Sequence, residues 1–189
     1  LSKNAKKGVS VSDDLFKKIS DTVSPQGIIA VAKMPEPLKT LDSRGRYIAL
    51  ENIADPSNIG AVARTAEALG ACGLIISGDS CDVFSPKALR ASMGTLLRMP
   101  LYFCEDITDC LSKNSLRGFA CIPRDTADLK MGGFNFADGD VVIIGNEANG
   151  LSEKTVQGAY KTVTISMRGR AESLNAASAA AIALWELTR

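Results

Sequence analysis

The stretch YIALENIADPSNIGAVARTAEALGACGLIIS, residues 47–77, contains the pattern on which the fold depends. It begins with a short apolar strand (47–53), continues through a predicted helix from about 58 to 69, and ends in a second apolar strand (73–77). Neither strand alternates between polar and apolar residues, which is typical of strands with both faces covered. Strand, helix and strand in series predict parallel strands joined by a crossover helix.

The same alternation continues along the chain. Further apolar strands are predicted at 100–103, 118–122, 141–145 and 163–166, and further helices at 86–92, 106–113, from 152, and at 174–188. We therefore expect an α/β fold in which helices flank a parallel sheet. Residues 25–43 contain three of the seven prolines around one short apolar strand, which indicates a linker and a domain boundary near 40.

Composition limits the chemistry that this chain can perform. Its 189 residues, 46% hydrophobic and 23% charged, suit one compact domain with a small appendage. Because histidine is absent, Ser-His-Asp catalysis, Cys-His catalysis and histidine-bearing zinc motifs are excluded. The five cysteines form no CxxC pair, and no apolar run approaches the ~18 residues of a membrane span. We expect a cytoplasmic protein with reduced thiols, no bound metal and no membrane partner.

The amino-terminal segment is rich in lysine. Five lysines fall within the first 18 residues, namely Lys3, Lys6, Lys7, Lys17 and Lys18. A solvated helix or frayed end is the favoured interpretation, and an arm that contacts a phosphate backbone is the alternative. The net charge of +1 neither requires nor excludes a polyanionic partner.

In a parallel α/β sheet, ligands bind where the carboxyl ends of strands run into helices. Neither GxGxxG nor GxxxxGK[ST] occurs, so another motif must define the site. After the strand 47–53, Ser57 or Asn58 is expected to cap the next helix. Arg64 lies beyond two small residues, Gly60 and Ala61, which slightly favours an anion site. The alternative is an ordinary surface arginine paired with Glu67 or another acid.

Two later segments also place polar residues after strands. In VVIIGNEANGLSEKT (141–155), two glycines and two asparagines predict a tight loop, with Glu147 at the mouth of the sheet and Ser152 as a helix cap. The segment 163–189 leads into a helix with six alanines between 176 and 183, which we expect to be buried in the core or at a subunit interface. Ser173 fits the cap of that helix, and Asn175 in its first turn suggests ligand contact.

These three segments, in this order, resemble the motifs of the SpoU class (TrmH-like) of SPOUT RNA methyltransferases. The matching stretches are NIGAVARTAEALG, IIGNEANGLS and ISMRGRAESLNAASAAAIALWE, with KALRASMGTLLRMPL also similar, and the resemblance covers about residues 46–189. It implies a deep trefoil knot at the carboxyl end of the sheet. It also implies that residues 1–40 are a linker and the remnant of an N-terminal RNA-binding domain, followed by a catalytic domain over 41–189.

The resemblance further implies an enzyme that transfers a methyl group from S-adenosylmethionine to a ribose 2′-hydroxyl in RNA, and that works as a homodimer with the active site completed across the interface. The implied cofactor-binding residues are Gly145, Asn146, Glu147, Gly150, Ile165, Met167, Leu174 and Asn175. The implied catalytic residues are Arg64, Asn58, Glu147, Ser173 and Asn175.

The general base stays open between two of these residues. Arg64 occupies the position of the family's proposed base, but a guanidinium holds its proton too tightly to be a ready acceptor, so we prefer it as the group that fixes the phosphate and the 2′-oxygen. Glu147 is the rival acceptor, and burial could raise its pKa. Asn58, Ser173 and Asn175 would orient the nucleotide or stabilise the developing charge.

Ribosomal RNA, from the large subunit by preference, is the favoured substrate, and transfer RNA is the alternative. RNA binding would need the arginines to gather on one face. The set is Arg44, Arg46, Arg90, Arg98, Arg168 and Arg170. Two other classes remain: a catalytically inactive RNA-binding homologue and a nucleotide-dependent oxidoreductase. The intact motif residues argue against the first, and the missing glycine fingerprint argues against the second.

Overall fold

A computed structural model describes residues 7–123 and 127–189 of the chain. The chain divides into two units, Leu1–Met34 and Pro35–Arg189. The described part of the first unit contains one helix, α1 (Asp13–Ile19), which Ser12 caps and which buries no side chain. The prediction of a solvated helix is therefore confirmed around Lys17 and Lys18, whereas Lys3 and Lys6 lie outside the described residues.

The apolar strand expected within residues 25–43 does not form. Ile28, Ile29 and Val31 are exposed, and this stretch contains neither helix nor strand. The prediction was wrong because a strand needs a neighbour to accept and donate its backbone hydrogen bonds, and Ile28, Ile29 and Val31 join none of the strands of the sheet.

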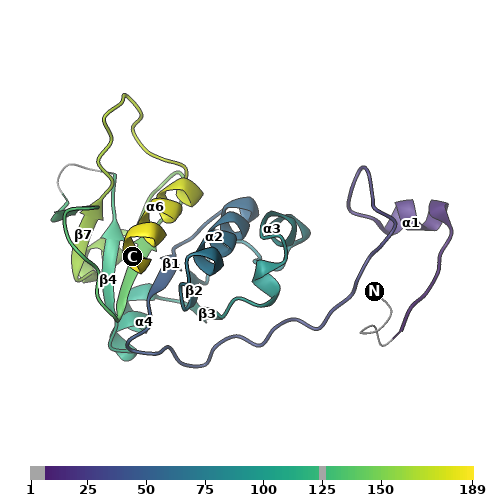
Figure 1. The fold of residues 1–189 in the computed structure, drawn as a ribbon, viewed down its shortest axis with the longest axis horizontal. Helices are drawn as coiled ribbons and strands as arrows, with labels where there is room; N and C mark the ends of the chain where they lie inside the picture. Colours follow the sequence, from purple (N-terminus) through teal and green to yellow (C-terminus); the bar gives the residue numbers. More distant parts are fainter. Residues whose placement is uncertain (1–6, 124–126) are drawn as a thin grey trace. The chain divides into compact units, whose positions relative to one another are not determined.

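The second unit is built on one sheet of seven strands in the order β3-β2-β1-β6-β4-β7-β5, and every neighbouring pair is parallel (Figure 1). The strands are β1 (Tyr47–Leu50), β2 (Gly73–Ser77), β3 (Leu101–Cys104), β4 (Arg117–Cys121), β5 (Leu129–Lys130), β6 (Asp140–Ile144) and β7 (Lys161–Thr164). The predicted parallel α/β sheet is confirmed. The two-residue strand β5 had no recognisable signal, because a pair of residues is too short to show a pattern.

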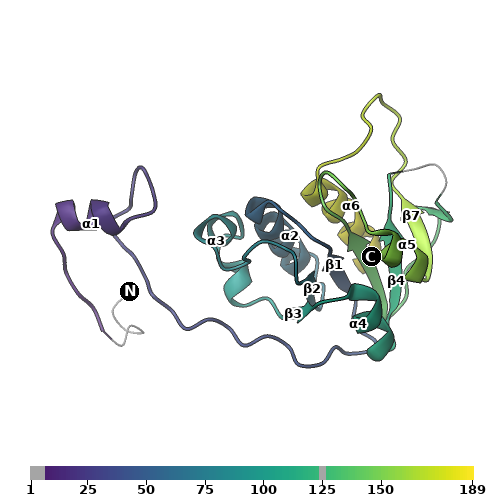
Figure 2. The same ribbon diagram turned by 180° about the vertical axis from the view of Figure 1, so that it is seen from behind.

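Helices cover both faces of the sheet. On one face lie α2 (Pro56–Ala68), α3 (Pro86–Ala91) with the short helix η1 (Thr95–Leu97), and α6 (Ala176–Thr188); on the other lie α4 (Ile107–Lys113) and α5 (Glu153–Gly158), as Figure 2 shows. Every residue of β1, β2 and β6 is buried, as continuous apolar strands predict.

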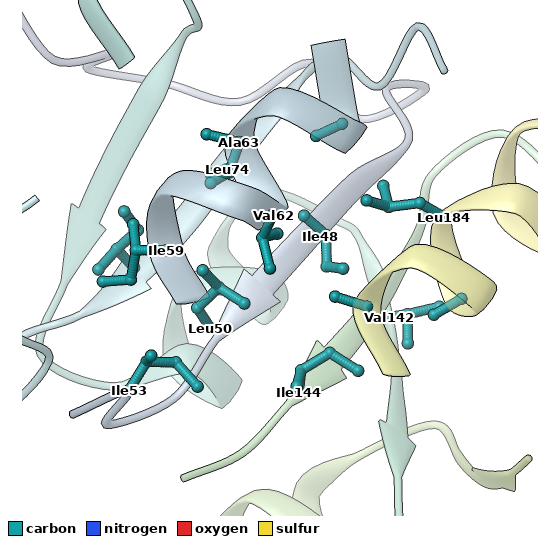
Figure 3. Packing of buried hydrophobic residues seen from close by; sticks show 14 of the residues in the cluster. Ile48, Leu50, Ile53, Ile59, Val62, Ala63, Leu74, Val142, Ile144 and Leu184 are labelled. Carbon is teal, nitrogen blue, oxygen red and sulfur yellow. The ribbon is translucent and has the colours of Figure 1, made fainter. Parts of the chain in front are cut away.

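Alternate residues of each central strand enter separate cores. From β1, Ile48 and Leu50 pack beneath α2 and α6 together with Val62 and Leu184 (Figure 3). Tyr47 and Ala49 belong to the second core, under α4. At the ~25 cal/mol per Å² typical of apolar burial, these two layers supply the main stabilisation of the unit.

The predicted helix caps were displaced. Asp55 caps α2 by accepting a hydrogen bond from the backbone N–H of Ser57 at 2.9 Å, so this helix begins two residues earlier than expected. Asn175, not Ser173, caps α6. Ser152 caps α5 as predicted. In both incorrect cases a neighbouring Asp or Asn was equally able to accept from the free N–H groups of the first turn.

Gly60 has a role in helix packing. A Cβ atom on Gly60 would come within 2.5 Å of the carbonyl oxygen of Ala88 and 2.6 Å of the Cβ of Ala91. Glycine is therefore required because α3 crosses α2 closely at this point. The small size of this residue, which favoured an anion site near Arg64, has a different explanation.

Candidate active site

A cavity of about 790 Å³ opens at the carboxyl ends of β4, β6 and β7. Most residues expected to hold the cofactor line it, namely Gly145, Asn146, Glu147, Gly150, Ile165, Met167 and Leu174; Ser173 also lines it, and Asn175 does not. Sequence reasoning missed further parts of the wall, which come from the end of β4 (Cys121–Pro123), from α5 (Val156, Gln157) and from α6 (Ala176, Ala179). The position agrees with the rule that ligands bind at the carboxyl edge of parallel sheets.

The loop after β6 folds back on itself. Asn146 and Gly150 form an antiparallel bridge through two backbone hydrogen bonds of 3.0 and 2.9 Å, and Gly150 adopts a φ of +68°. Gly145 lies so close to the backbone of Gly150 and Leu151 that a Cβ atom would overlap it. The two glycines therefore make the turn possible, as the predicted tight loop required.

The side chain of Asn146 organises this loop. Its Oδ1 accepts hydrogen bonds from the backbone N–H groups of Ala148 (2.9 Å) and Asn149 (3.0 Å), and its Nδ2 donates to the carbonyl oxygen of Asn52 at 2.7 Å. Asn52 has a φ of 54°, a left-handed conformation that asparagine tolerates better than most residues. The loops after β1 and β6 are thereby joined.

Glu147 strengthens the same junction. Its carboxylate accepts hydrogen bonds from the backbone N–H groups of Ala54 (3.1 Å) and Asp55 (3.3 Å) and from Nδ2 of Asn58 (2.7 Å). Asn58 Oδ1 in turn accepts from Nδ2 of Asn175 at 3.1 Å. Glu147, Asn58 and Asn175, one residue from each of the three sequence motifs, thus form a continuous hydrogen-bonded chain.

The direction of this chain follows from the capping role of Asn175. Its Oδ1 accepts from the backbone N–H groups of Ala177 and Ser178, which leaves Nδ2 as the donor to Asn58. Asn58 is buried, with 8% of its surface exposed, so its amide is held in one orientation between a donor and an acceptor. The site therefore has little freedom to rearrange at these three residues.

The pKa of Glu147 is shifted opposite to expectation. Burial by itself would raise it, but the hydrogen bond from Asn58 and those from its own backbone N–H and the N–H groups of Ala54 and Asp55 together lower the pKa below its ordinary value. The expectation that burial raises this pKa was wrong, because donors surround the carboxylate. A carboxylate with a lowered pKa is a poorer proton acceptor.

This shift predicts how stability depends on pH. Because the carboxyl of Glu147 has a lower pKa in the folded chain than in the unfolded chain, the stabilisation is complete above the unfolded pKa and is lost as the pH falls through the folded pKa. In urea titrations, we expect the stability difference between the native chain and Glu147→Gln to be constant above about pH 5.5 and to shrink below about pH 4.5. A difference that grows on acidification would contradict the hydrogen-bonded, ionised Glu147.

Arg64 lies apart from this network. It is exposed on α2, and no hydrogen bond or ion pair links it to the described residues. The alternative pairing with Glu67 is excluded, because Glu67 accepts hydrogen bonds from Arg98 (2.7 Å) and from Thr95 (2.9 Å). The guanidinium of Arg64 is therefore available to a ligand or a partner chain.

Lys87 and Asp55 form a salt bridge beside the first turn of α2, with the two atoms 2.8 Å apart. The hydrogen bond from Lys87, and those from Ser57, lower the pKa of Asp55 to about 2. Asp55 is thus ionised at neutral pH while it caps α2. This pair contributes modestly to stability because both side chains are well exposed.

Sequence reasoning missed two residues of the site area. Glu51, directly after β1, is a buried carboxylate, although its position after an apolar strand is a feature that could have identified it. Cys121 lines the cavity at the end of β4, where burial raises the pKa of its thiol to about 11. The five cysteines are free thiols, as expected.

The arginines expected to form one RNA-binding face are dispersed. Arg46 donates a hydrogen bond to the carbonyl oxygen of Leu187 at 2.8 Å and pairs with Asp138, at the amino end of β1. Arg98 is held by Glu67. Arg168 and Arg170 follow β7, at the opposite, carboxyl edge. The condition that these arginines share one face is therefore not met within one chain, because the amino and carboxyl ends of parallel strands lie at opposite edges.

Among the described residues, no group of three or more His, Cys, Asp and Glu side chains is arranged to hold a metal ion. A search of the same residues finds no helix with the length and apolarity needed to cross a membrane.

Comparison with known proteins gives consistent results. The model of the SpoU rRNA methylase family matches residues 45–185. A 23S rRNA (uridine(2479)-2′-O)-methyltransferase of Streptomyces viridochromogenes is 32% identical over 191 residues, which cover 96% of this chain and 67% of the relative. The 23S rRNA (guanosine(2553)-2′-O)-methyltransferase RlmP of Bacillus subtilis is 27% identical over 179 residues, covering 94% of this chain and 71% of that protein.

A solved structure extends the similarity to the fold. The SpoU methyltransferase AviRb from Streptomyces viridochromogenes, in complex with AdoMet, superposes with a TM-score of 0.84 at 29% identity, covering 95% of this chain and 72% of that chain. The present chain spans about two thirds of the length of its Streptomyces relative.

Proposed function

The chain belongs to the SpoU rRNA methylase family, and on this premise we propose that it transfers a methyl group from S-adenosylmethionine to a ribose 2′-hydroxyl of RNA. The main support for this proposal is the hydrogen-bonded chain of Glu147, Asn58 and Asn175 beside the cavity. It joins the three family motifs at one place, at the edge of the sheet where ligands bind.

The cavity suits the cofactor in size and chemistry. Its volume of about 790 Å³ falls within the roughly 300–1,000 Å³ usual for sites of drug-sized ligands. Ile144, Ile165 and Leu174 supply apolar surface, and the loop Gly145–Gly150 supplies backbone groups. When bound, S-adenosylmethionine supplies an electrophilic methyl group, so this chain has only to position the acceptor oxygen and receive its proton.

Each catalytic residue has a role compatible with its surroundings. Arg64, whose guanidinium has no described partner, binds the phosphate next to the acceptor ribose and holds the 2′-oxygen in place. Asn58 and Asn175 are fixed by the network and orient the nucleotide, together with the hydroxyl of Ser173 in the cavity wall. Glu147 holds Asn58 and the loop 54–55 in position; its lowered pKa makes it the weaker candidate for general base.

We also propose that the chain acts as a homodimer through α6 and α2. On α6, one apolar side enters the core, whereas Ile182 and Trp185 are 39% and 59% exposed. The helix is therefore buried on its core side, and the subunit interface that was the alternative expectation is proposed for its exposed side. Exposed apolar groups of this size are typical of interfaces, and α2, which carries Arg64, packs beside α6. A second copy at this surface would bring Arg64 towards the partner's cavity.

Trp185→Glu tests this interface. A tryptophan in the centre of an interface contributes at least ~2 kcal/mol, so we expect dimerisation to weaken by about 30-fold or more. Sedimentation equilibrium across micromolar concentrations measures this change. Tyr160→Glu, which changes an aromatic residue of similar exposure (56%) next to β7, is the matched control and should leave the dimer intact. A Trp185→Glu chain that dimerises like the native protein would contradict the proposed interface.

The deep trefoil knot is part of this proposal. Strand β7 lies towards the β5 edge of the sheet, yet α6, which follows it, packs against β6 and α2 near the centre. The connection between them, 165–175, lines the same cavity as the loop 145–150. These placements support a chain that crosses the loop after β6 before it enters α6.

Ribosomal RNA of the large subunit is the proposed substrate, since the Streptomyces and Bacillus relatives are 23S rRNA methyltransferases. The cytoplasm is the proposed location. We further propose that residues 1–40 are a linker and the remnant of an N-terminal RNA-binding domain, and that residues 41–189 form the catalytic domain. The division of the chain into the units Leu1–Met34 and Pro35–Arg189 supports a boundary in this region.

Two measurements test the function. Isothermal titration with S-adenosylmethionine is expected to give saturable binding at about one molecule per chain. Incubation with unmodified 23S rRNA and labelled cofactor, followed by mapping of alkali-resistant linkages, is expected to locate a 2′-O-methyl group. Cofactor binding without methylation of ribosomal or transfer RNA would favour the inactive RNA-binding homologue, and absence of both would contradict the proposed function.

A further inference from the structure

Glu51 is a buried carboxylate outside the catalytic set. Only 8% of its surface is exposed, directly beyond the carboxyl end of β1. Its Oε2 accepts a hydrogen bond from the backbone N–H of Ser152 at 2.9 Å, and its Oε1 accepts from the hydroxyls of Ser152 (2.9 Å) and Thr155 (2.5 Å). A buried carboxylate is costly unless donors compensate it, and here the described donors are all neutral groups of one helical turn.

That helical turn forms part of the cavity wall. Ser152 caps α5, and Leu151, Val156 and Gln157 on either side of it line the cavity. Glu51 itself does not line the cavity. Strand β1 is paired on both sides, with β2 and β6, and therefore belongs to the rigid centre of the sheet. The carboxylate of Glu51 connects this centre to the cavity wall.

Other contacts do not duplicate this connection. Asn52 and Glu147 hold the loop 145–150 to the segment after β1, but they do not reach α5. On the far side of α5, Lys154 forms an exposed salt bridge with Asp106 at 2.6 Å, a kind of pair that contributes little. Without Glu51, the first turn of α5 would lose the hydrogen bonds that join it to the end of β1 in the described residues.

We infer that Glu51 is a positioning residue for the cofactor: its carboxylate fixes the first turn of α5, and so sets the shape of the cavity wall. This inference rests on the proposed function, since it takes the cavity as the S-adenosylmethionine site. A displaced wall weakens every contact that it makes with a bound cofactor, while Arg64 and Asn58 on α2 are left in place. Glu51 should therefore affect cofactor affinity more than the rate at saturation.

The test compares Glu51→Ala with Asp140→Ala in the full chain. Asp140 is the matched control, a 1% exposed carboxylate at the amino end of β6 that accepts hydrogen bonds from Arg117 (2.7 Å) and from the backbone of Ala137 (2.8 Å). Both variants lose a buried carboxylate and are expected to melt at lower temperature. Titration with S-adenosylhomocysteine, well below both melting temperatures, should show Kd raised about tenfold or more for Glu51→Ala and changed less than about twofold for Asp140→Ala.

A second variant keeps the test decisive if Glu51→Ala fails to fold. Thr155→Val preserves the shape of a buried side chain and removes one of the three hydrogen bonds, so Kd should rise by about threefold, with the cofactor KM rising in parallel and kcat unchanged. Unchanged Kd in a folded Glu51→Ala or Thr155→Val chain, or an equal loss in Asp140→Ala, would overturn the inference while leaving the proposed function intact. Failure of the native chain to bind S-adenosylhomocysteine would overturn both.

Discussion

Arg64→Ala is expected to lower kcat for methyl transfer to 23S rRNA by about 10²- to 10³-fold, the loss typical of removing one group that stabilises charge in a transition state. Arg64 is exposed on α2 and does not line the cavity, so the Kd for S-adenosylhomocysteine should change by less than about twofold. Single-turnover assays with labelled cofactor and unmodified 23S rRNA measure the first quantity, and calorimetry measures the second.

Two controls separate a specific role from general electrostatics. Arg64→Lys keeps the charge but loses the two-pronged geometry of the guanidinium, and should recover only part of the rate. Lys113→Ala removes one exposed positive charge from the last turn of α4, on the other face of the sheet, and should alter kcat by less than about threefold. A near-native rate for Arg64→Ala would remove this residue from the mechanism, and a loss of cofactor binding would place it at the cofactor instead.

Gly145→Ala is expected to weaken cofactor binding by about 100-fold and to destabilise the chain by about 1–3 kcal/mol. The added methyl group would overlap the backbone of Gly150 and Leu151, and these are main-chain atoms rather than the end of a flexible side chain. The loop that forms one wall of the cavity must then open. Calorimetric titration with S-adenosylhomocysteine and urea denaturation measure the two effects.

Gly169→Ala is the matched control, because a Cβ atom at Gly169 would meet nothing within 4 Å. Gly169 lies in the connection between β7 and α6, close in sequence to the cavity residue Met167. Its substitution should leave affinity and stability within experimental error. If Gly145→Ala binds the cofactor like the native chain, the folded-back loop is not part of the cofactor site.

Much of this site could be predicted from the order of residues along the chain. Continuous apolar strands separated by helical patterns predicted a parallel sheet, because a strand covered on both faces needs no polar side. The same rule placed Glu147 and Asn175 near one edge, because loops that follow parallel strands meet there. Resemblance to known motifs supplied the cofactor and the reaction, which composition and periodicity could not.

The incorrect predictions concern positions where neighbouring residues could take the same role or where the contacting residue is distant in the sequence. Asp55 and Asn175 cap α2 and α6 in place of Ser57 or Asn58 and Ser173, since several adjacent polar residues could each accept from the first helical turn. Gly60 accommodates α3, a neighbour that is distant in the sequence, and a lone glycine does not reveal which backbone approaches it.

The sequence by itself determined the α/β architecture, the three loops that meet at the carboxyl edge, and the residues available there. Only the tertiary structure decided how those residues act on one another. The lowered pKa of Glu147, the fixed amide of Asn58 and the anchoring of α5 by Glu51 all depend on hydrogen bonds between residues 89 to 117 positions apart. Such bonds form when strands take their places in the sheet, so their donors cannot be identified from neighbours along the chain.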